Sequence, residues 1–550
     1  MRSRALVVAG LVACGTANSR SPHEPGDGGS AGDPIDGQAG ARFSEGGSEH
    51  ERETGEAGAH EGGAGGAGQA DVDGSAGSRD CDPSLPVDSA DVPRARGLEL
   101  HQIAVFQGVK VPIMELGYEL SSRQVNLVTG RPALLRAYVE PADGWKARVV
   151  TARLILDEPA LDEPQVHEQS RLILGVSNDA QLASTFNFEI AADLITENTA
   201  YSIELLEAEP CLSDTGDDTA ARFPNEAEAP LGALPGALLQ IQIVPIESDT
   251  GSVMLAPDTS EQQLEGLRAQ VMRLFPISEL ELTLREQPLT ATGTTMVEVL
   301  DQVAALRETE NPAPNVVYYG LVRLTETREQ YCTPSCVLGA SFNGELPAVG
   351  VGVGIGYTGD ESARAFAHEL GHVYGRPHTP CGVAGDAGYP YSGGRIGSWG
   401  YDVDRKILIN PDTYTDFMGY CQPSWVSDHT YEHLRDFIAH IESPVQAVEA
   451  FSVGRAPNAE QGYRSLVIQP GKPPAWGRAR RLRGNPGGMA ELAQVFDASG
   501  HGLSQGAAIF RRRVADVSAE IVYIPEWACR SGASLQLGQE RIRLPSGCVP

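Results

Sequence analysis

Three residues of the chain, His368, Glu369 and His372, have the types and spacing that metal chemistry requires. On an α-helix, residues i and i+4 lie on the same face, so His368 and His372 can direct two imidazole nitrogens at one ion. Glu369 lies beside them and can reach a water molecule on that ion. Gly375 lets the backbone leave the helix, and His378 can then supply a third ligand. The motif HExxHxxGxxH therefore predicts a zinc site with one tetrahedral position left for water.

This set of residues predicts hydrolysis. Three neutral imidazoles leave Zn²⁺ its full charge, which lowers the pKa of bound water to about 7 and polarises a peptide carbonyl. Glu369 then accepts the proton of the water and returns it to the leaving amine. A purely structural zinc site would need a fourth protein ligand and would have no use for Glu369. The sequence thus predicts a zinc-dependent endopeptidase.

The chain resembles the metzincin metalloproteases in this motif and in a second segment, Thr415 to Cys421 (TDFMGYC). That segment looks like the methionine turn that lies beneath the metal in the family, with Met418 as the turn methionine. Tyr420 matches the tyrosine that touches zinc or steadies the oxyanion in astacin-like and serralysin-like members. The combination of features is most similar to bacterial secreted metzincins that cleave mucin-type glycoproteins. The resemblance covers about residues 250–443 and implies a zinc cofactor and an extracellular protein or glycoprotein substrate.

Residues 349–356 alternate Val or Ile with Gly, which predicts a strand with one face free of side chains. The resemblance to metzincins implies that substrate lies antiparallel to such a bare edge strand, which makes Gly352 and Gly354 substrate-binding residues. The same pattern also fits a strand packed closely against another backbone. In the loop after the zinc motif, Trp399 and Tyr401 either line the specificity pocket or hold the loop together.

The N-terminus has the pattern of an export signal. Arg2 and Arg4 precede an apolar run, residues 5–13, that is too short to cross a bilayer. The run ends in LVACG, which resembles the lipobox of bacterial lipoproteins and implies lipid attachment at Cys14. The alternative is that the protein is simply secreted and that Cys14 carries no lipid. We expect the protein to be anchored to the membrane through this lipid, on the bacterial outer membrane or cell surface, or else to be secreted.

Composition sets further limits. The net charge is −31, from 42 Lys and Arg against 73 Asp and Glu, which excludes nucleic acid as a partner. Residues 14–93 consist mainly of Gly, Ala, Ser and acidic residues, too poor in large apolar side chains to fold, so we expect a disordered tether.

Cysteine usage fits the same compartment. Eight cysteines remain besides Cys14, an even number that predicts disulfides in an exported chain. Local spacing favours the pairs Cys332–Cys336, Cys381–Cys421 and Cys529–Cys548, which leaves Cys81–Cys211. The alternative for Cys332 and Cys336, which form a CxxxC motif, is that they supply half of a metal site.

The chain is predicted to be multidomain. The expected parts are a signal peptide (1–13), the tether (14–93), an N-terminal all-β sandwich (94–247), a central α/β (α+β) metzincin-like protease domain (248–445) and a small C-terminal β domain (446–550). Short alternating runs separated by Pro, Gly, Asn and Asp predict the sandwich, with residues 238–246 as its last run. Helical periods at 260–274 and 294–306 alternate with apolar strands in the central part.

Two other functions fit these features. The two β domains could make the protein chiefly a surface adhesin with a minor or self-processing protease activity. Alternatively, the zinc unit could be an amidase that acts on cell-wall peptides. Cleavage of protein that is lost with a chelator and with Glu369→Ala distinguishes the endopeptidase from both.

Overall fold

The computed structural model describes residues 92–208, 218–291, 295–344, 349–442, 460–482, 485–503, 506–529 and 533–545. The predicted signal peptide and the lipidation residue Cys14 lie outside the described residues, as does the predicted tether up to residue 91. The described residues all belong to one compact unit, Ser78–Pro550. None of the helices within the described ranges has the length and apolar character needed to span a bilayer.

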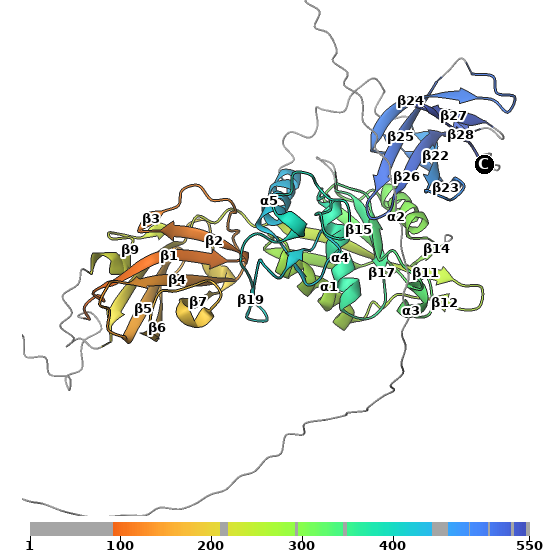
Figure 1. The fold of residues 1–550 in the computed structure, drawn as a ribbon. Helices are drawn as coiled ribbons and strands as arrows, with labels where there is room; N and C mark the ends of the chain where they lie inside the picture. The colour runs from red at the N-terminus through yellow and green to blue at the C-terminus, as the bar shows by residue number, and fades with distance from the viewer. Residues whose placement is uncertain are drawn as a thin grey trace, which may run out of the picture. The chain divides into compact units, whose positions relative to one another are not determined.

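Two antiparallel sheets form the N-terminal part (Figure 1). The first contains β1 (Leu98–Phe106), β2 (Gly108–Glu115), β3 (Tyr118–Glu119), β4 (Ala133–Pro141) and β7 (Phe186–Ile190). The second contains β5 (Arg148–Asp157), β6 (Gln165–Ile173), β8 (Ala200–Glu207), β9 (Arg222–Phe223) and β10 (Ala229–Pro230). The 3₁₀ turns η1 (Leu182–Ser184), η2 (Ala192–Leu194) and η3 (Thr219–Ala221) lie in the connections. Alternate residues of both sheets enter one hydrophobic core, as in a β-sandwich.

A mixed sheet forms the central part, with strand order β12-β11-β15-β17-β16. Its strands are β11 (Leu238–Asp249), β12 (Met254–Leu255), β13 (Glu279–Leu284), β14 (Leu289–Ala291), β15 (Val316–Val322), β16 (Gly339–Ser341) and β17 (Val351–Ile355). β11, β15 and β17 run parallel, whereas β16 pairs antiparallel with β17 at the sheet edge. β13 and β14 pair in parallel with the other side of β11.

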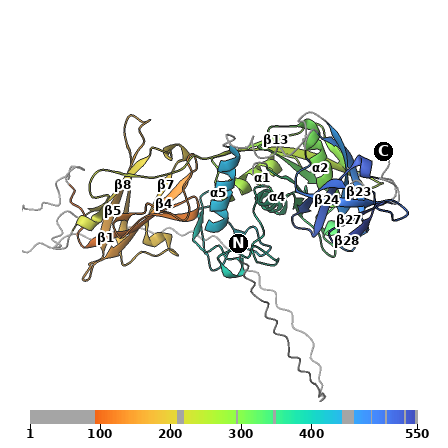
Figure 2. The same ribbon diagram turned by 90° about the horizontal axis from the view of Figure 1, so that it is seen from above.

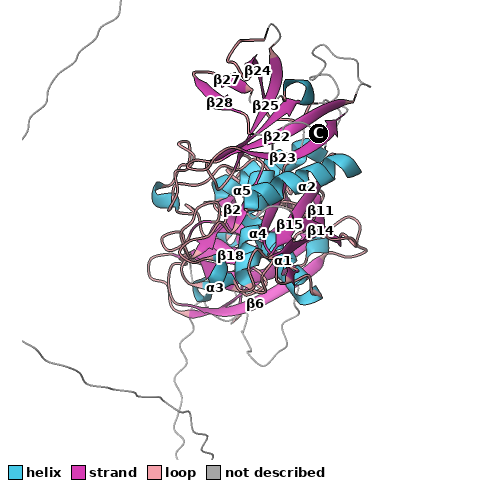
Figure 3. Cartoon of the chain, turned by 90° about the vertical axis from the view of Figure 1, so that its right-hand side faces the viewer, coloured by secondary structure: helices cyan, strands magenta, loops and turns pink. Residues whose placement is uncertain are grey.

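The longer helices belong to this central part (Figure 3). They are α1 (Glu261–Leu274), α2 (Met296–Glu310), α4 (Asp360–Val373) and α5 (Asp428–Glu442), with α3 (Arg328–Tyr331) as a single turn. Ser260 caps α1 by accepting a hydrogen bond from the Gln263 amide, and Thr295 with Glu298 forms the capping box of α2. These local signals explain why both predicted helices begin close to the expected residues.

The side chains of β15 separate the two faces of the central sheet. Val317, Tyr319 and Leu321 share a core with α1 and α4. Tyr318 and Val322 point to the other face and share a core with α2. The zinc-motif helix and α2 therefore lie on opposite faces of the sheet.

Strand β11 corrects the predicted boundary at residues 247/248. The run 238–246 alternates apolar and polar residues, a pattern that predicts the last strand of the sandwich. In the structure, β11 pairs in parallel with β13 and β15 and is thus a strand of the central sheet. Its alternation arises because one face packs on helices while Gln240 and Gln242 lie on the other, where Gln240 donates to Glu281. A half-exposed parallel strand has the same period as a sandwich strand.

The C-terminal part is an antiparallel sheet with strand order β23-β22-β26-β25-β24-β27-β28. Its elements are β22 (Gln461–Ile468), β23 (Ala475–Leu482), β24 (Met489–Phe496), β25 (Ala507–Val514), β26 (Ala519–Pro525), η6 (Glu526–Ala528), β27 (Ser534–Leu537) and β28 (Glu540–Arg543). Tyr463, Phe510 and Tyr523 of this sheet lie in the same hydrophobic cluster as Val299 and Leu300 of α2. The expected C-terminal β part thus shares a core with the central part.

The segment between His378 and Met418 reaches the N-terminal sandwich. β18 (Gly400–Asp402) pairs with β2, and β19 (Ile407–Ile409) pairs with β18, so both extend the first sheet. The segment also contains η4 (Ser392–Gly394) and β20 (Thr415–Asp416), which pairs with β21 (Ser424–Trp425). Glu432 of α5 accepts hydrogen bonds from the backbone and side chain of Asn126, and Figure 2 shows α5 between the sandwich and α4.

Candidate metal centre

Helix α4 carries His368 and His372 one turn apart, with Glu369 next to His368, as the spacing predicts. The helix ends at Val373, and Gly375 adopts a φ of 79°, which a residue with a side chain rarely adopts. This conformation turns the chain back toward the helix. It brings His378 beside the two helical histidines.

The four donor atoms of the candidate centre lie close together. One ring nitrogen each of His368, His372 and His378 and a carboxylate oxygen of Asp516 all lie within 4.8 Å of one another. The Nε2 atoms of His372 and His378 are only 3.2 Å apart. Imidazole nitrogens that converge in this way fit a Zn²⁺ ion.

Backbone carbonyls fix the tautomers of the two helical histidines. His368 Nδ1 lies 2.7 Å from the carbonyl oxygen of Phe417, and His372 Nδ1 lies 2.5 Å from that of Arg376. Because a carbonyl can only accept, each Nδ1 carries a proton, and in the neutral ring Nε2 therefore keeps the lone pair. Burial also lowers the pKa of His372, which favours its neutral form. For His368, burial is outweighed by the Asp516 carboxylate, which raises the pKa, so this ring serves as a ligand once Nε2 has lost its proton.

Glu369 is buried beside the histidines, with 2% of its surface exposed. Its Oε2 accepts a hydrogen bond of 2.6 Å from the hydroxyl of Ser341 on β16. Burial, together with the nearby Asp516 carboxylate, raises the pKa of Glu369 well above its ordinary value. A carboxylate with a raised pKa suits a general base that must give its proton back near neutral pH.

The edge strand β16 supplies two residues that sequence reasoning missed. Besides Ser341, Gly339 faces Glu369 so closely that an added Cβ would lie 2.4 Å from its Oε1. The only signal in the sequence is the short run Val337 to Phe342 (VLGASF), which precedes the glycine-rich strand. A strand of three residues carries too little periodicity to be predicted.

Met418 and Tyr420 lie on the turn that supports α4. Met418 is fully buried, and its sulfur would lie 2.2 Å from a Cβ added at Gly371 of the helix. The Tyr420 ring centroid lies 5.1 Å from that of His378, and the side chain is 48% exposed. The structure therefore brings both residues to the centre as expected, and the catalytic role of Tyr420 stays a prediction.

Two of the predicted disulfides are confirmed, Cys332–Cys336 and Cys381–Cys421. The second joins the segment after His378 to the Met418 turn, and the first excludes the alternative of a metal site at the CxxxC. Cys529 is disulfide-bonded. Its predicted partner Cys548, and the predicted pair Cys81–Cys211, lie outside the described residues.

The glycine-rich strand does not have the predicted edge position. β17 lies inside the sheet, paired with β15 on one side and β16 on the other. The side that Gly352 and Gly354 leave bare is filled by Tyr319, whose hydroxyl would lie 2.2 Å from a Cβ added at Gly354. The prediction that these two glycines bind substrate at a sheet edge was therefore wrong. Close packing explains the pattern, although Gly352 and Gly354 pack mainly against the Tyr319 side chain and not against another backbone.

Trp399 and Tyr401 do not line the cleft either. Tyr401 lies on β18, where it pairs with Gly108 and its ring packs 6.4 Å from that of Phe106. The Trp399 carbonyl accepts a hydrogen bond of 2.8 Å from the Lys110 amide. Both residues attach the long loop to the sandwich, so the prediction that they form the specificity pocket was wrong.

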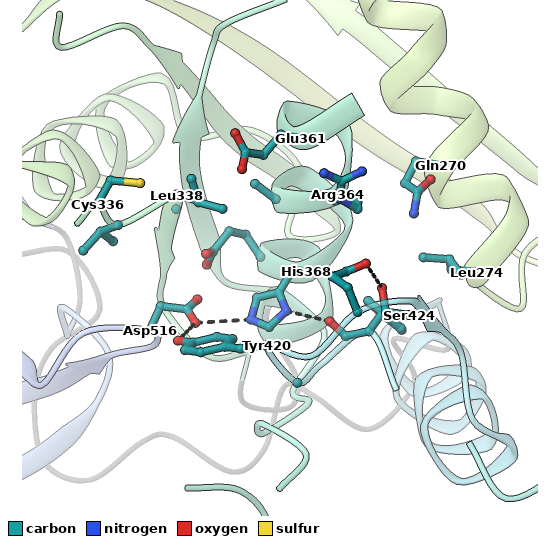
Figure 4. Close-up of a pocket in the computed structure, with 17 residues that line it drawn as sticks. Gln270, Leu274, Cys336, Leu338, Glu361, Arg364, His368, Tyr420, Ser424 and Asp516 are labelled. Carbon is teal, nitrogen blue, oxygen red and sulfur yellow. Dashed lines mark hydrogen bonds and ion pairs between the residues drawn. The ribbon is translucent and has the colours of Figure 1, made fainter. Parts of the chain in front are cut away.

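A cleft of about 400 Å³ opens beside the candidate centre (Figure 4). Leu274 of α1, Leu338 and Phe417 are among its apolar lining residues. Its polar lining residues include Gln270, Arg364, His368, Glu369, Tyr420, Ser424 and Asp516. The cleft can therefore hold a peptide side chain next to Glu369 and the histidines.

Asp516 was not predicted as part of the site. It lies in the turn between β25 and β26 of the C-terminal sheet, 148 positions after His368. Its side chain is 8% exposed. The sequence around Asp516, RRRVADVSAE, indicates only a turn between two strands. The position of Asp516 has no regular spacing from the zinc motif that could have identified it.

One segment of the central part matches a family of known proteins. Residues 326–434 match the family described as Peptidase M66. This segment contains the three histidines, Glu369, Met418 and Tyr420, and it ends before the C-terminal sheet.

The chain is also similar to Dictomallein-1 of Dictyostelium discoideum, with 32% identity over 143 residues, or 24% of this chain and 21% of the relative. The chain thus spans about a fifth of the length of that curated relative. Among solved structures, metalloproteinase-II from Bacteroides fragilis aligns with 60% of this chain and 87% of that chain, at 10% identity and a TM-score of 0.22. A chaperone–substrate complex aligns with 46% of this chain and 39% of that chain, at 13% identity and a TM-score of 0.20. At these TM-scores neither structure identifies a shared fold.

Proposed function

We propose that the protein is a zinc-dependent endopeptidase of the metzincin type that hydrolyses peptide bonds of extracellular proteins or glycoproteins. The observation that carries the proposal is the convergence of His368, His372 and His378 next to the buried carboxylate of Glu369. The match of residues 326–434 to a peptidase family supports it.

The donor set fits a zinc ion. Backbone carbonyls accept the Nδ1 protons of His368 and His372, so the neutral rings present their Nε2 lone pairs to a cation. Asp516 Oδ2 is buried without a hydrogen-bond partner, which is costly unless a cation lies beside it. When bound, zinc would supply a Lewis acid that polarises the peptide carbonyl and acidifies water.

Glu369 performs the proton transfers in this proposal. Its carboxylate accepts a proton from the attacking water and delivers it to the nitrogen of the leaving amine. Ser341 holds one carboxylate oxygen by a hydrogen bond of 2.6 Å, which leaves the other oxygen for the water. The Tyr420 hydroxyl, on the open side of the histidines, would donate to the oxyanion that forms from the carbonyl.

Substrate is proposed to bind along β16. This strand is the edge of the central sheet and lines the cleft through Gly339, so a peptide can add to the sheet there by main-chain hydrogen bonds. In this proposal, substrate pairs with β16, the neighbour of the glycine-rich strand β17, and not with β17 itself. Export, with a lipid anchor at Cys14 on the outer membrane or cell surface, or else secretion, is part of the same proposal.

The test is digestion of casein and of a mucin-type glycoprotein by the purified full-length protein, with product mass spectrometry. The Asp516 carboxylate lies beside the three histidines that would bind zinc. The Asp516→Ala variant is therefore assayed in parallel with the wild type. Glu369→Gln should lower the rate by about 10²–10⁴-fold without loss of zinc, and a chelator should abolish it. The matched control is Asp360→Asn, an exposed carboxylate at the start of the same helix that does not line the cleft.

Three outcomes would contradict the endopeptidase. Cleavage that persists in Glu369→Gln or in chelator would exclude the proposed chemistry. Tight glycoprotein binding that is indifferent to both changes would indicate an adhesin. Release of peptides from purified peptidoglycan, with no cleavage of protein, would indicate an amidase.

A further inference from the structure

We propose that the β25–β26 hairpin is a built-in inhibitor of the metal centre. In this proposal Asp516 supplies a fourth ligand to the ion, and the backbone at Val514 and Ala515 covers the edge strand at which substrate pairs. The inference rests on the proposed function, because it assumes the same zinc site. It adds a state of the protein in which that site is closed.

The carboxylate of Asp516 faces all three histidines. Its Oδ1 lies 2.7 Å from His378 Nε2 and 3.2 Å from His368 Nε2, and its Oδ2 lies 3.5 Å from His372 Nε2 (Figure 4 shows the contact with His368). Oδ1 also accepts a hydrogen bond of 2.6 Å from the Tyr420 hydroxyl. Asp516 therefore engages both the metal ligands and the residue proposed to stabilise the oxyanion.

The charges of this cluster call for a cation. When the rings of His368 and His372 are neutral, their protons lie on Nδ1, toward backbone carbonyls, and their Nε2 atoms present lone pairs to the carboxylate. A buried carboxylate placed against such lone pairs is stable when a metal ion lies between them. Asp516 is thus positioned as a ligand of the ion, at the coordination position that water needs during hydrolysis.

The backbone before Asp516 occupies the substrate position. Val514 forms an antiparallel bridge with Phe342, and the Ala515 amide donates a hydrogen bond of 2.9 Å to the Ser341 carbonyl. These contacts continue the central sheet beyond β16, as an added peptide strand would. The Arg512 guanidinium lies 3.9 Å from the centroid of the Phe342 ring and closes the same edge.

The conformation of the turn points to a dedicated role. Asp516 has a φ of 65°, in the left-handed region that non-glycine residues seldom adopt. Backbone of this kind persists where the surrounding structure holds it, and it is concentrated at ligand clamps and switches. Here it directs the carboxylate out of the hairpin and into the centre.

The remainder of the C-terminal sheet holds the hairpin in place. Arg480 of β23 is 2% exposed and pairs with Asp301 and, at 2.8 Å, with Glu308, both on α2. The Ser465 hydroxyl donates a hydrogen bond of 2.7 Å to the same Asp301 carboxylate. The position of Asp516 therefore follows from a packed interface and does not depend on a free loop.

A permanent four-ligand site would be structural, and two features argue against that reading. Glu369 is buried beside the histidines, where a structural zinc site has no use for it, and the cleft of about 400 Å³ remains open next to it. Both features are explained if Asp516 leaves when the enzyme becomes active. The hairpin then exposes β16 and the fourth coordination position together.

The test uses the full-length protein loaded with Co²⁺, whose visible spectrum reports the ligands of the ion. Acetohydroxamate, a small bidentate metal ligand, is added to wild type, Asp516→Ala and Asp516→Asn. The proposal expects at least about tenfold tighter hydroxamate binding in both variants, because the competing carboxylate is gone. Asp497→Ala is the control, since Asp497 lies in another turn of the C-terminal sheet, where its carboxylate accepts hydrogen bonds from the backbone of Ser499 and His501 and lies 3.8 Å from the His501 ring.

Peptide cleavage is measured on the same samples loaded with Zn²⁺. Cleavage that is at least tenfold faster in Asp516→Ala, with unchanged cleavage in the control, supports the inhibitor. Equal hydroxamate binding in wild type and both variants overturns it, whether or not the protein cleaves peptides. If the hydroxamate difference is observed but no form cleaves protein, the proposed function fails while the fourth-ligand assignment stands. If the Ala variant does not fold, the Asn variant decides, because it keeps the size and polarity of the side chain.

Discussion

Gly339→Ala should disable catalysis by displacing the general base while leaving the metal ligands in place. An ideal Cβ at this position would lie 2.4 Å from Glu369 Oε1, 2.5 Å from its Cγ and 2.7 Å from its Cδ. Ordinary contacts begin at 3.4 Å, so the carboxylate must withdraw by about 1 Å. The edge strand has little freedom to move instead, because all three of its residues pair with β17.

The expected magnitude follows from this displacement. A misplacement of about 1 Å in a catalytic group lowers the rate by about 10²-fold, or about 2.7 kcal/mol of transition-state stabilisation. The loss should fall on kcat, since Gly339→Ala removes no substrate contact. The zinc content should not change, because the three atoms nearest to the added Cβ all belong to Glu369.

The assay compares kcat and KM for a fluorogenic peptide in the Asp516→Ala background, with metal content measured in parallel. Gly266→Ala is the matched control, because a Cβ at this position of α1 meets nothing within 4 Å. A Gly339→Ala protein that keeps its activity within about threefold would refute the placement of Glu369 as the base. Loss of zinc in this variant would refute the separation of base and metal ligands.

Other changes test the remaining contacts. Ser341→Ala removes the hydrogen bond that orients Glu369 and should lower kcat by about tenfold with KM unchanged. Arg480→Met leaves the buried charge of Asp301 unpaired and should lower the free energy of unfolding in urea by about 3–5 kcal/mol. Burial lowers the pKa of His429, the second residue of α5, to about 4, so the unfolded chain gains its proton at a higher pH than the folded protein. Stability should therefore fall by about 1–2 kcal/mol, after discounting for solvent, as the pH decreases from about 6.5 to about 4, and His429→Gln should remove this dependence.

The sequence was sufficient wherever the signal was local. The spacing of His368 and His372 placed both on one helix face, and the caps at Ser260 and Thr295 fixed the starts of α1 and α2. The confirmed disulfides also joined cysteines that are near in sequence, separated by 4 and 40 positions. In each case the physical cause lies within a few turns of the chain or in one loop.

The sequence was insufficient where a residue acts through a distant partner. The glycine pattern around Gly354 predicts a bare edge, but Tyr319 from the neighbouring strand fills that space. Tyr401 has the character of a pocket residue, but its strand pairs with β2 of the sandwich. Asp516 joins the centre only because the C-terminal sheet packs on α2, and nothing within its own turn encodes that packing. Pairing partners of strands and docking faces of sheets are properties of the assembled core.

The shared core of α2 and the C-terminal sheet indicates how the hairpin can release the metal. Removal of the whole sheet would expose side chains such as Val299, Tyr463 and Tyr523, each of which contributes about 1.5–3 kcal/mol by burial. Withdrawal of the turn 515–518 breaks far less, chiefly the Ala515 hydrogen bond and the contacts of Asp516. A cleavage site for a sequence-specific protease inserted between Val517 and Ser518 should therefore activate the enzyme once cut, with little change in the melting temperature. If the cut protein melts as before but binds hydroxamate no better than the uncut one, the turn does not control access to the ion.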